Sequence, residues 1–518
     1  MARRAACADR RRDRRDHERD HRQVLRSLIS PVLFAGCKPE VAAFDGRVIA
    51  VGEGARAAAG RKAEVVRLRG VAWPGLIDSH IHLAHLAERK LSVDLTGATD
   101  LADALARVKR WARALPKGAW VIGSGWYNDV WPETAFPTRQ QLDAAVAGRP
   151  AYLRRKDGHS AWASSAALRA AGIEAASEAP AGGLIDRDGA GEPTGILRET
   201  AMQLVSKDLP RPSDADLDVA IAAVLVDLAQ LGLTSVHSMD NAPTLASLQR
   251  VRASGALPVR VSYNLPLKDL PHAERMGVRS GWGDPWLRVW GVKAFLDGSL
   301  GSRTAEMLDG SGTARLTQPD LVDLVERAAR AELNVCLHAI GDGAVRRALD
   351  ALAPHRTAWS MWRPRIEHAQ CVNPKDMTRM ARLGVIASMQ PIHAVADREL
   401  ADAMWSEVTK HAYAWRALAK AGVRLAFGSD APVETADPLA GIEAATTWRK
   451  QAKWYPELAL TKAAALRAYT SNAAYAAGME ADLGALRPGK LCDMTVVDDR
   501  GLVATVAGGR LTWRRTPA

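Results

Sequence analysis

Eight short apolar runs, most of them separated by stretches with helical periodicity, constrain the fold of this chain more than any other feature of its sequence. The runs lie at residues 76–80, 234–237, 259–264, 287–295, 334–337, 365–367, 385–389 and 424–428. Helical patterns between the later runs lie at residues 320–331, 344–352, 373–382 and 412–421. Strands that alternate with helices form parallel sheets, and eight such units close into a barrel. The sequence therefore predicts an α/β protein built on a (β/α)8 TIM-like barrel.

A long insertion separates the first predicted strand from the second. The gap is about 150 residues, whereas a connection from a strand to the next strand through one helix needs a small fraction of that length. The insertion has strand patterns of its own at residues 119–123 and 151–155 and a helical pattern at 101–115. We therefore expect an inserted α/β subdomain, about residues 90–210, above the mouth of the barrel, where long loops after barrel strands lie.

Tryptophan is unusually frequent, with 16 residues against 5 phenylalanines and 7 tyrosines. Trp126, Trp131 and Trp162 fall in the insertion. They either line an aromatic lid over a bulky apolar substrate group or belong to the core of the subdomain.

Short strands and tight turns characterise both ends of the chain. Asp45-Gly46 lies between two β-rich runs, which is a strong hairpin signal. The C-terminal residues have the same character. We expect residues 31–72 and 483–518 to form one small β-sandwich domain, which leaves residues 73–482 for the barrel and its insertion.

Much of the positive charge is concentrated at the N-terminus. Residues 1–26 contain ten arginines and five acidic residues, so this segment carries +5 of the net charge of +12. An arginine-rich segment with few apolar residues cannot bury enough surface to become ordered. We expect a disordered tail and no specific nucleic-acid partner; the alternative for the tail is non-specific binding of anions.

The cysteines indicate a reducing compartment. All five are scattered, and no two are spaced as Cys-x-x-Cys. No apolar run approaches the roughly 18–20 residues that a membrane-spanning helix needs. We therefore expect a cytoplasmic protein without a membrane partner. The alternative is a lipoprotein signal ending at Cys37, but Pro31 interrupts its apolar run and Arg26 lies beside it.

Chemically active side chains stand at the carboxyl ends of several predicted strands. His80 and His82 close the first strand, and residues i and i+2 of a strand point to the same face. All carboxyl ends of barrel strands lie at one rim, so we expect the following side chains to converge there: His80, His82, Lys293, His338, His368 and Asp430. Four imidazoles, one carboxylate and one amine suit zinc or a similar divalent ion.

Each of these residues also has a structural interpretation. A single buried histidine in a strand can be an ordinary core residue with satisfied hydrogen bonds. Lys293 can pair with Asp297 as an ordinary cation. Asp430, which precedes Ala431-Pro432, can cap the N-terminus of a helix.

Nine motifs follow one another from about residue 31 to the end of the chain. They are PGLIDSHIHL, RRKDGHSAW, GILRETAM, VKAFLDGSLGSRTA, LHAIGDGAV, RIEHAQ, MQPIHA, FGSDAPVE and GALRPGKLCDMTVVD. Together they resemble the metal-dependent amidohydrolase superfamily and, more narrowly, its YtcJ-like branch, to which N-substituted formamide deformylases belong. This chain departs from the branch in having Trp162-Ala163-Ser164-Ser165 where most members have an asparagine, a residue expected on the substrate side.

The resemblance implies a metal centre with up to two ions. His80, His82 and Asp430 would bind the more buried ion, and His338 and His368 would bind the second. The implied cofactor is zinc or a similar divalent ion, with one or two ions per chain.

The resemblance also implies roles for Lys293 and Asp430. Lys293, carboxylated by carbon dioxide, would bridge two ions; carboxylation needs the neutral amine, which burial beside cations favours. Asp430 would accept the proton of the attacking water and deliver it to the leaving nitrogen. Weaker candidates for substrate contacts are His159, Arg303 and Gln390.

The predicted function is metal-dependent hydrolysis of a C–N bond, other than a peptide bond, in an amide or N-substituted formamide. The partner is then a small-molecule substrate, and a homo-oligomer is compatible with the sequence. One alternative keeps the fold but binds a single ion through His80, His82, His338 and Asp430 and deaminates a heterocycle. The other is a catalytically silent scaffold, against which the complete set of ligands argues.

Overall fold

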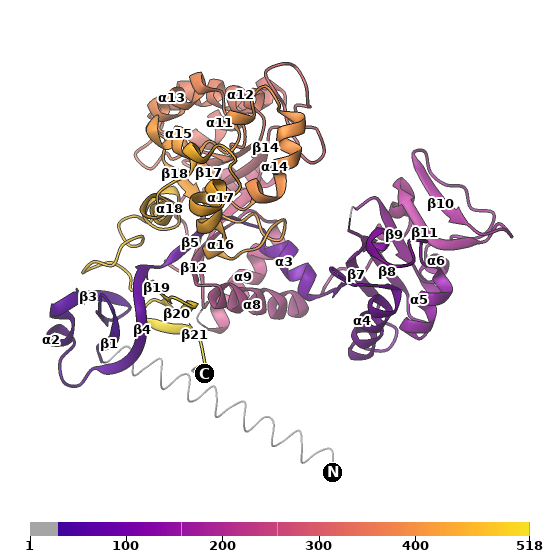
Figure 1. The fold of residues 1–518 in the computed structure, drawn as a ribbon, viewed down its shortest axis with the longest axis horizontal. Helices are drawn as coiled ribbons and strands as arrows, with labels where there is room; N and C mark the ends of the chain where they lie inside the picture. The colour runs from indigo at the N-terminus through magenta and orange to yellow at the C-terminus, as the bar shows by residue number, and fades with distance from the viewer. Residues whose placement is uncertain (1–29, 157, 256, 517–518) are drawn as a thin grey trace, which may run out of the picture. The chain divides into compact units, whose positions relative to one another are not determined.

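The computed structural model describes residues 30–156, 158–255 and 257–516, so the predicted tail over residues 1–26 lies outside the described residues. The chain divides into two compact units (Figure 1). Of the described residues, those in 30–84 and 221–516 form the first unit, and those in 85–220 form the second. Within the described residues no helix is long and apolar enough to cross a membrane.

An eight-stranded parallel sheet is the centre of the first unit. Its strands, in chain order, are β5 (Leu76–Ile81), β12 (Leu233–Ser238), β13 (Arg260–Pro266), β14 (Leu287–Phe295), β15 (Asn334–Ala339), β16 (Arg365–His368), β17 (Ile386–Met389) and β18 (Leu425–Phe427). Each strand pairs with its neighbours in the chain, and most of their residues are buried, as expected for a sheet covered on both faces. These strands confirm the predicted barrel.

Backbone hydrogen bonds just beyond β18 close the barrel. Asp430 N donates to His80 O at 2.7 Å, and His82 N donates to Ala431 O at 2.9 Å. The last strand of the barrel is thereby joined to the first. The bonds lie at the carboxyl ends of both strands, where the polar candidates were expected.

Helices cover the outside of the barrel. They include α9 (Ala242–Ser254), α11 (Gln318–Arg330), α12 (Asp342–Leu352), α13 (Pro374–Leu383) and α15 (Trp415–Lys420), and Figure 1 shows α11, α12 and α13 grouped beside β14. In α11 the buried residues Leu321, Leu324, Val325 and Ala328 repeat with the helical period, which gives the helix one apolar face.

One predicted helix begins later than expected. The sequence predicts a helix over residues 412–421, but α15 begins at Trp415. Tyr413 has a left-handed backbone with φ 51°, which a regular helix does not admit.

Strands from both ends of the chain form a second sheet in the first unit. Its order is β21 (Arg510–Arg514), β20 (Gly501–Ala507), β19 (Met494–Asp498), β4 (Glu64–Pro74), β1 (Val32–Lys38), β2 (Val41–Phe44) and β3 (Arg47–Val51). The predicted turn between β2 and β3 has φ 49° at Asp45 and 72° at Gly46, as a two-residue hairpin turn requires. Because the barrel and this sheet share one compact unit, the boundary of a separate β domain at residues 31–72 and 483–518 stays a prediction.

The second unit contains its own six-stranded sheet. The order is β10 (Gly183–Arg187), β11 (Pro193–Glu199), β9 (Ser160–Ala163), β8 (Ala151–Arg155), β7 (Val121–Trp126) and β6 (Val93–Asp94), with α4 (Leu101–Ala114) and α5 (Arg139–Val146) among its helices. Trp126, Trp131 and Trp162 are buried in its apolar cluster, so these three are core residues.

Candidate metal centre

The carboxyl end of β5 carries the first two candidate ligands. His80 is fully buried within the strand, and His82 follows directly after it. Their ring centroids lie 5.4 Å apart. Met239 O lies 3.1 Å from His82 Nδ1, and a carbonyl only accepts, so the Nδ1–H donates to it. A neutral His82 therefore presents the lone pair of Nε2 to the centre.

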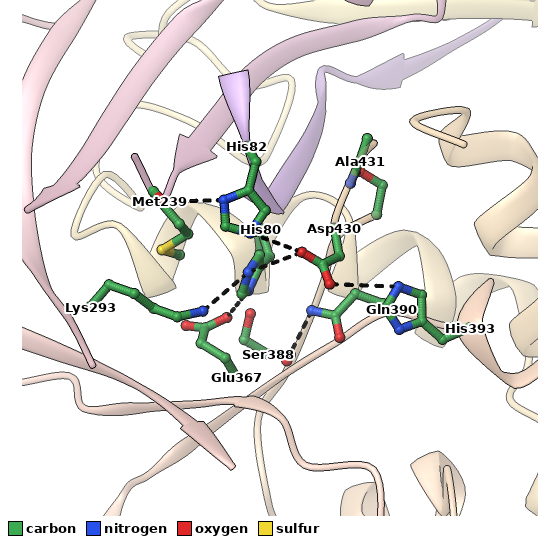
Figure 2. Close-up of polar contacts among 12 residues, drawn as sticks. His80, His82, Met239, Lys293, Glu367, Ser388, Gln390, His393, Asp430 and Ala431 are labelled. Atoms are coloured by element: carbon green, nitrogen blue, oxygen red, sulfur yellow. Dashed lines mark hydrogen bonds and ion pairs between the residues drawn. The ribbon is translucent and has the colours of Figure 1, made fainter. Parts of the chain in front are cut away.

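Asp430 lies opposite these histidines, just beyond β18. Its Oδ1 is 3.1 Å from His82 Nε2 and 3.4 Å from His80 Nε2 (Figure 2). His368, Asp430 and His80 each offer a ligand atom, and these atoms all lie within 4.8 Å of one another. His368 and Asp430 have left-handed backbones, with φ 71° and 60°. Such conformations cost roughly 1–3 kcal/mol each and cluster at active sites.

His338 and His368 extend the cluster from the ends of β15 and β16. Their ring centroids lie 4.4 Å apart. His338 Nε2 is 2.9 Å from Gly298 O, so it donates there and leaves a lone pair on Nδ1. The Nδ1 atoms of both rings are buried without a hydrogen-bond partner in the described part of the chain.

Lys293 reaches the cluster from β14. Its side chain is buried, and its Nζ lies 3.2 Å from His80 Nε2. Burial lowers its pKa, which favours the neutral amine.

The electrostatics of the cluster favour neutral imidazoles. Burial lowers the pKa of His80 to about 4 and that of His338 to about 3. Burial also lowers the pKa of His368 well below its ordinary value. Metal ions bind neutral imidazole, so these rings are in the form that ligation requires.

Together these residues fit a divalent cation. Asp430 Oδ1 lies 3.4 Å from His80 Nε2 and 3.1 Å from His82 Nε2. When both imidazoles are neutral and carry their proton on Nδ1, these three atoms all present lone pairs, and no proton lies between them. A cation would remove that repulsion and would pair the buried nitrogens. A set of nitrogen and oxygen donors is typical of zinc sites.

Glu367 and His393 lie in the cluster although the sequence analysis did not select them. Glu367 Oε2 is 2.7 Å from His80 Nδ1. His393, the first residue of α14 (His393–Met404), places Nε2 3.8 Å from Asp430 Oδ2 (Figure 2). His393 follows shortly after the end of β17, and Glu367 lies on the same face of β16 as Arg365. These positions indicate a role at the site only once the barrel geometry is known.

The three weaker candidates have different surroundings. Gln390 is buried directly after β17 and lies beside His393 in Figure 2. Arg303 is exposed on the loop after β14. His159 belongs to the second unit, where its ring is exposed. Its Nδ1 lies 3.0 Å from Glu199 Oε1. Contacts of these residues with substrate stay predictions.

The barrel and the polar cluster at its rim define a metal-dependent hydrolase of the amidohydrolase type. The family model described as "Amidohydrolase family" matches residues 68–515, and this chain belongs to that family. The match confirms the resemblance stated from the motifs.

Two relatives match most of the chain. It is 32% identical over 455 residues to "Putative amidohydrolase YtcJ" of Bacillus subtilis (strain 168), covering 84% of this chain and 85% of the relative. It is 30% identical over 488 residues to "N-substituted formamide deformylase" of Arthrobacter pascens, covering 89% of this chain and 90% of the relative.

A solved structure agrees with these matches. The crystal structure of an uncharacterized metal-dependent hydrolase from Pyrococcus furiosus superposes with a TM-score of 0.74 at 30% identity. The superposition covers 88% of this chain and 93% of that chain.

Proposed function

We propose that this metal-dependent hydrolase cleaves a C–N bond, other than a peptide bond, in an amide or N-substituted formamide. The observation that supports this most is the meeting of His80, His368 and Asp430 ligand atoms within 4.8 Å at one rim of the barrel. The relative named as an N-substituted formamide deformylase supports the choice of substrate class.

In this proposal His80, His82 and Asp430 hold one ion, and His338 and His368 hold a second. Zinc is the preferred candidate because the donors are imidazole nitrogens and a carboxylate. When bound, such an ion acts as a Lewis acid that polarises a carbonyl group and lowers the pKa of water to about 7.

Lys293 is carboxylated in the binuclear form of the proposal. Its neutral amine attacks the carbon of carbon dioxide, and a C–N bond forms as one C=O π bond breaks onto its oxygen. One N–H proton passes to water, so that a carbamate with two oxygens results. Complete burial and the lowered pKa of this lysine support the step.

Asp430 moves the proton in the proposed reaction. It accepts a proton from the attacking water and delivers it to the leaving nitrogen, which would otherwise depart as an unstable anion. Oδ1 faces His80 and His82, so Oδ2, on the side of His393, is the oxygen assigned to proton transfer.

Gln390 is the better supported of the proposed substrate contacts. Its Oε1 is buried and has no hydrogen-bond partner among the described residues, so it can accept from a substrate N–H group. His159 and Arg303 are proposed from their motifs alone.

A cytoplasmic location and a homo-oligomeric state also belong to the proposal. Cys37, Cys336, Cys371 and Cys492 are buried free thiols, which supports a reducing compartment.

A hydrolysis screen of the zinc-loaded full-length protein tests the proposal. The substrates are N-substituted formamides, N-acyl amino acids and cyclic amides, each with and without a chelator. We expect chelator-sensitive release of an amine and about two ions per chain by elemental analysis. About one ion per chain with deamination of a heterocycle would favour the mononuclear alternative. Absence of turnover of every amide would contradict the proposal.

A further inference from the structure

A buried ionic network lies in the barrel beneath the candidate metal centre. Arg365 and Glu367 are neighbours on one face of β16, and both are 0% exposed. Arg365 Nε donates to Glu367 Oε1 at 2.8 Å, and the other carboxylate oxygen, Oε2, lies 2.7 Å from His80 Nδ1. Arg365 Nη1 also lies 2.8 Å from His237 Nδ1. The proposed reaction uses none of these contacts.

Donor and acceptor capacity fixes the protons in this network. Arg365 donates to Oε1, and its permanent positive charge favours the carboxylate form of Glu367. A carboxylate only accepts, so the short contact with His80 requires a proton on Nδ1. A neutral imidazole has a single N–H, and His80 Nε2 therefore carries a lone pair. That lone pair faces Lys293 Nζ at 3.2 Å and Asp430 Oδ1 at 3.4 Å.

We propose that Glu367 is a positioning residue that holds His80 in the Nδ1–H tautomer and so turns the Nε2 lone pair towards the candidate metal ion. Arg365 orients the carboxylate of Glu367 through its hydrogen bond to Oε1. Histidines that bind metals generally donate their second N–H to a carboxylate or carbonyl, and loss of that partner weakens metal binding. The inference rests on the proposed function because it treats His80 as a ligand.

Glu367→Gln tests the inference most directly. Glutamine has the shape of glutamate, but an NH2 group, which donates, replaces one of the two accepting oxygens. Arg365 only donates, so the amide oxygen must stay on its side and the NH2 group then faces His80 Nδ1. Two donors cannot share a hydrogen bond, and the ring proton moves to Nε2. The lone pair is thereby removed from the side of the metal ion.

Two measurements on the full-length protein test this effect. In competition with a zinc chelator, we expect Glu367→Gln to bind zinc roughly 10–100-fold more weakly than the wild type. In 15N spectra of the metal-free wild type, we expect a protonated Nδ1 and an unprotonated Nε2 for His80, with the signals assigned by their loss in His80→Gln. In Glu367→Gln we expect the reverse, with Nε2 protonated and Nδ1 unprotonated.

Asp493→Asn is the matched control. It alters another buried carboxylate paired with an arginine, since Asp493 Oδ2 accepts from Arg260 Nε at 2.7 Å. Arg260 begins β13 and thus lies at the opposite end of the barrel strands from the metal centre. We expect a lower melting temperature but wild-type zinc affinity and wild-type His80 signals.

Three results would overturn the inference. They are a proton on His80 Nε2 in the wild type, zinc affinity of Glu367→Gln within about twofold of the wild type, and equal weakening in Asp493→Asn. If Glu367→Gln does not fold, the wild-type spectrum alone decides. Failure of the proposed function looks different, because the wild type would then bind no zinc while the tautomer of His80 remains measurable.

Discussion

The carboxylate of Asp430 has two oxygens in different surroundings. Oδ1 faces the imidazoles of His80 and His82, and Oδ2 faces His393 Nε2 at 3.8 Å. The backbone of Asp430 is left-handed, with φ 60°. One residue can therefore both bind a cation and move a proton, each with its own oxygen.

Asp430→Asn should separate folding from turnover. An amide has nearly the same shape but cannot accept a proton from water, so we expect turnover to fall at least about a hundredfold. The measurements are kcat for the best amide of the screen, the melting temperature and zinc content. Near-wild-type turnover would show that another group transfers the proton, and a collapsed melting temperature would show that the change is structural.

Single residues also show where sequence reasoning ends. Five of the selected residues close or closely follow an apolar run: His80, His82, His338, His368 and Asp430. Lys293 lies within such a run. Glu367 ends its own run, but its contact with His80 crosses the barrel and joins residues 287 positions apart. Its role depends on the strand order and the facing directions of two strands, which no local pattern encodes.

At the scale of elements, the junction of β18 and β5 at the barrel rim is tightly packed. A Cβ atom added to Gly428 would lie 2.5 Å from His80 N and 2.7 Å from Asp78 Oδ1. Asp78 also accepts hydrogen bonds from Ser429 N and Oγ at 3.0 and 2.6 Å. The two strand ends are thus held in contact by backbone as well as side-chain groups.

Gly428→Ala should force this junction apart. Overpacking against a backbone nitrogen costs about 1–3 kcal/mol of unfolding free energy, and it should weaken zinc binding because His80 must move. Urea unfolding and chelator competition provide the measurements. Gly301→Ala is the control, since nothing lies within 4 Å of its added Cβ, and it should leave both quantities unchanged. Equal effects of the two substitutions would contradict the steric explanation.

The eight barrel strands were predictable as elements because buried parallel strands are continuous apolar runs. The start of α15 at Trp415 was not predictable from the sequence, because the left-handed backbone at Tyr413 depends on tertiary contacts. Its backbone N–H donates to Gln370 O at 2.6 Å, and its hydroxyl donates to Asp397 Oδ2 at 2.5 Å. Neither contact is local enough to leave a sequence signal.

At the scale of the whole first unit, a buried ion pair joins the barrel to the sheet of the two chain ends. Arg260 on β13 and Asp493 before β19 are 2% and 3% exposed as side chains. The guanidinium also stacks over the Trp286 ring at 4.1 Å. This pair lies between parts of the chain that are 233 residues apart.

Arg260→Met should destabilise the first unit strongly. It leaves Asp493 buried without its cation, which costs roughly 3–5 kcal/mol of unfolding free energy. The double variant Arg260→Met/Asp493→Leu should regain most of that loss, because no buried charge remains. Chemical unfolding of Arg260→Met, Asp493→Leu and the double variant gives the coupling free energy between the two residues. Losses of unfolding free energy that simply add in the double variant would contradict the pairing of Arg260 with Asp493.

If zinc is the ion, it should stabilise the whole first unit, because the proposed ligands come from or directly after five strands of one closed sheet. An ion that binds only the folded state adds about 2.7 kcal/mol at a free concentration 100 times its dissociation constant. We expect the melting temperature to rise with added zinc and to fall again with a chelator. The rise should be much smaller in His80→Gln, and an equal rise in both proteins would place the bound zinc elsewhere.

The long strand β4 pairs with β1 over its first part and with β19 over residues 71–74. Thr495 on β19 also binds the barrel, since its Oγ1 accepts from Leu76 N at 3.1 Å and donates to Gly232 O at 2.7 Å. During translation, β4 therefore leaves the ribosome long before β19, its partner in the sheet. Until then β4 presents an unpaired edge, which other chains can join. This part of the sheet can thus form only after β19 has been made, and chains terminated before β19 are left as substrates for chaperones and proteases.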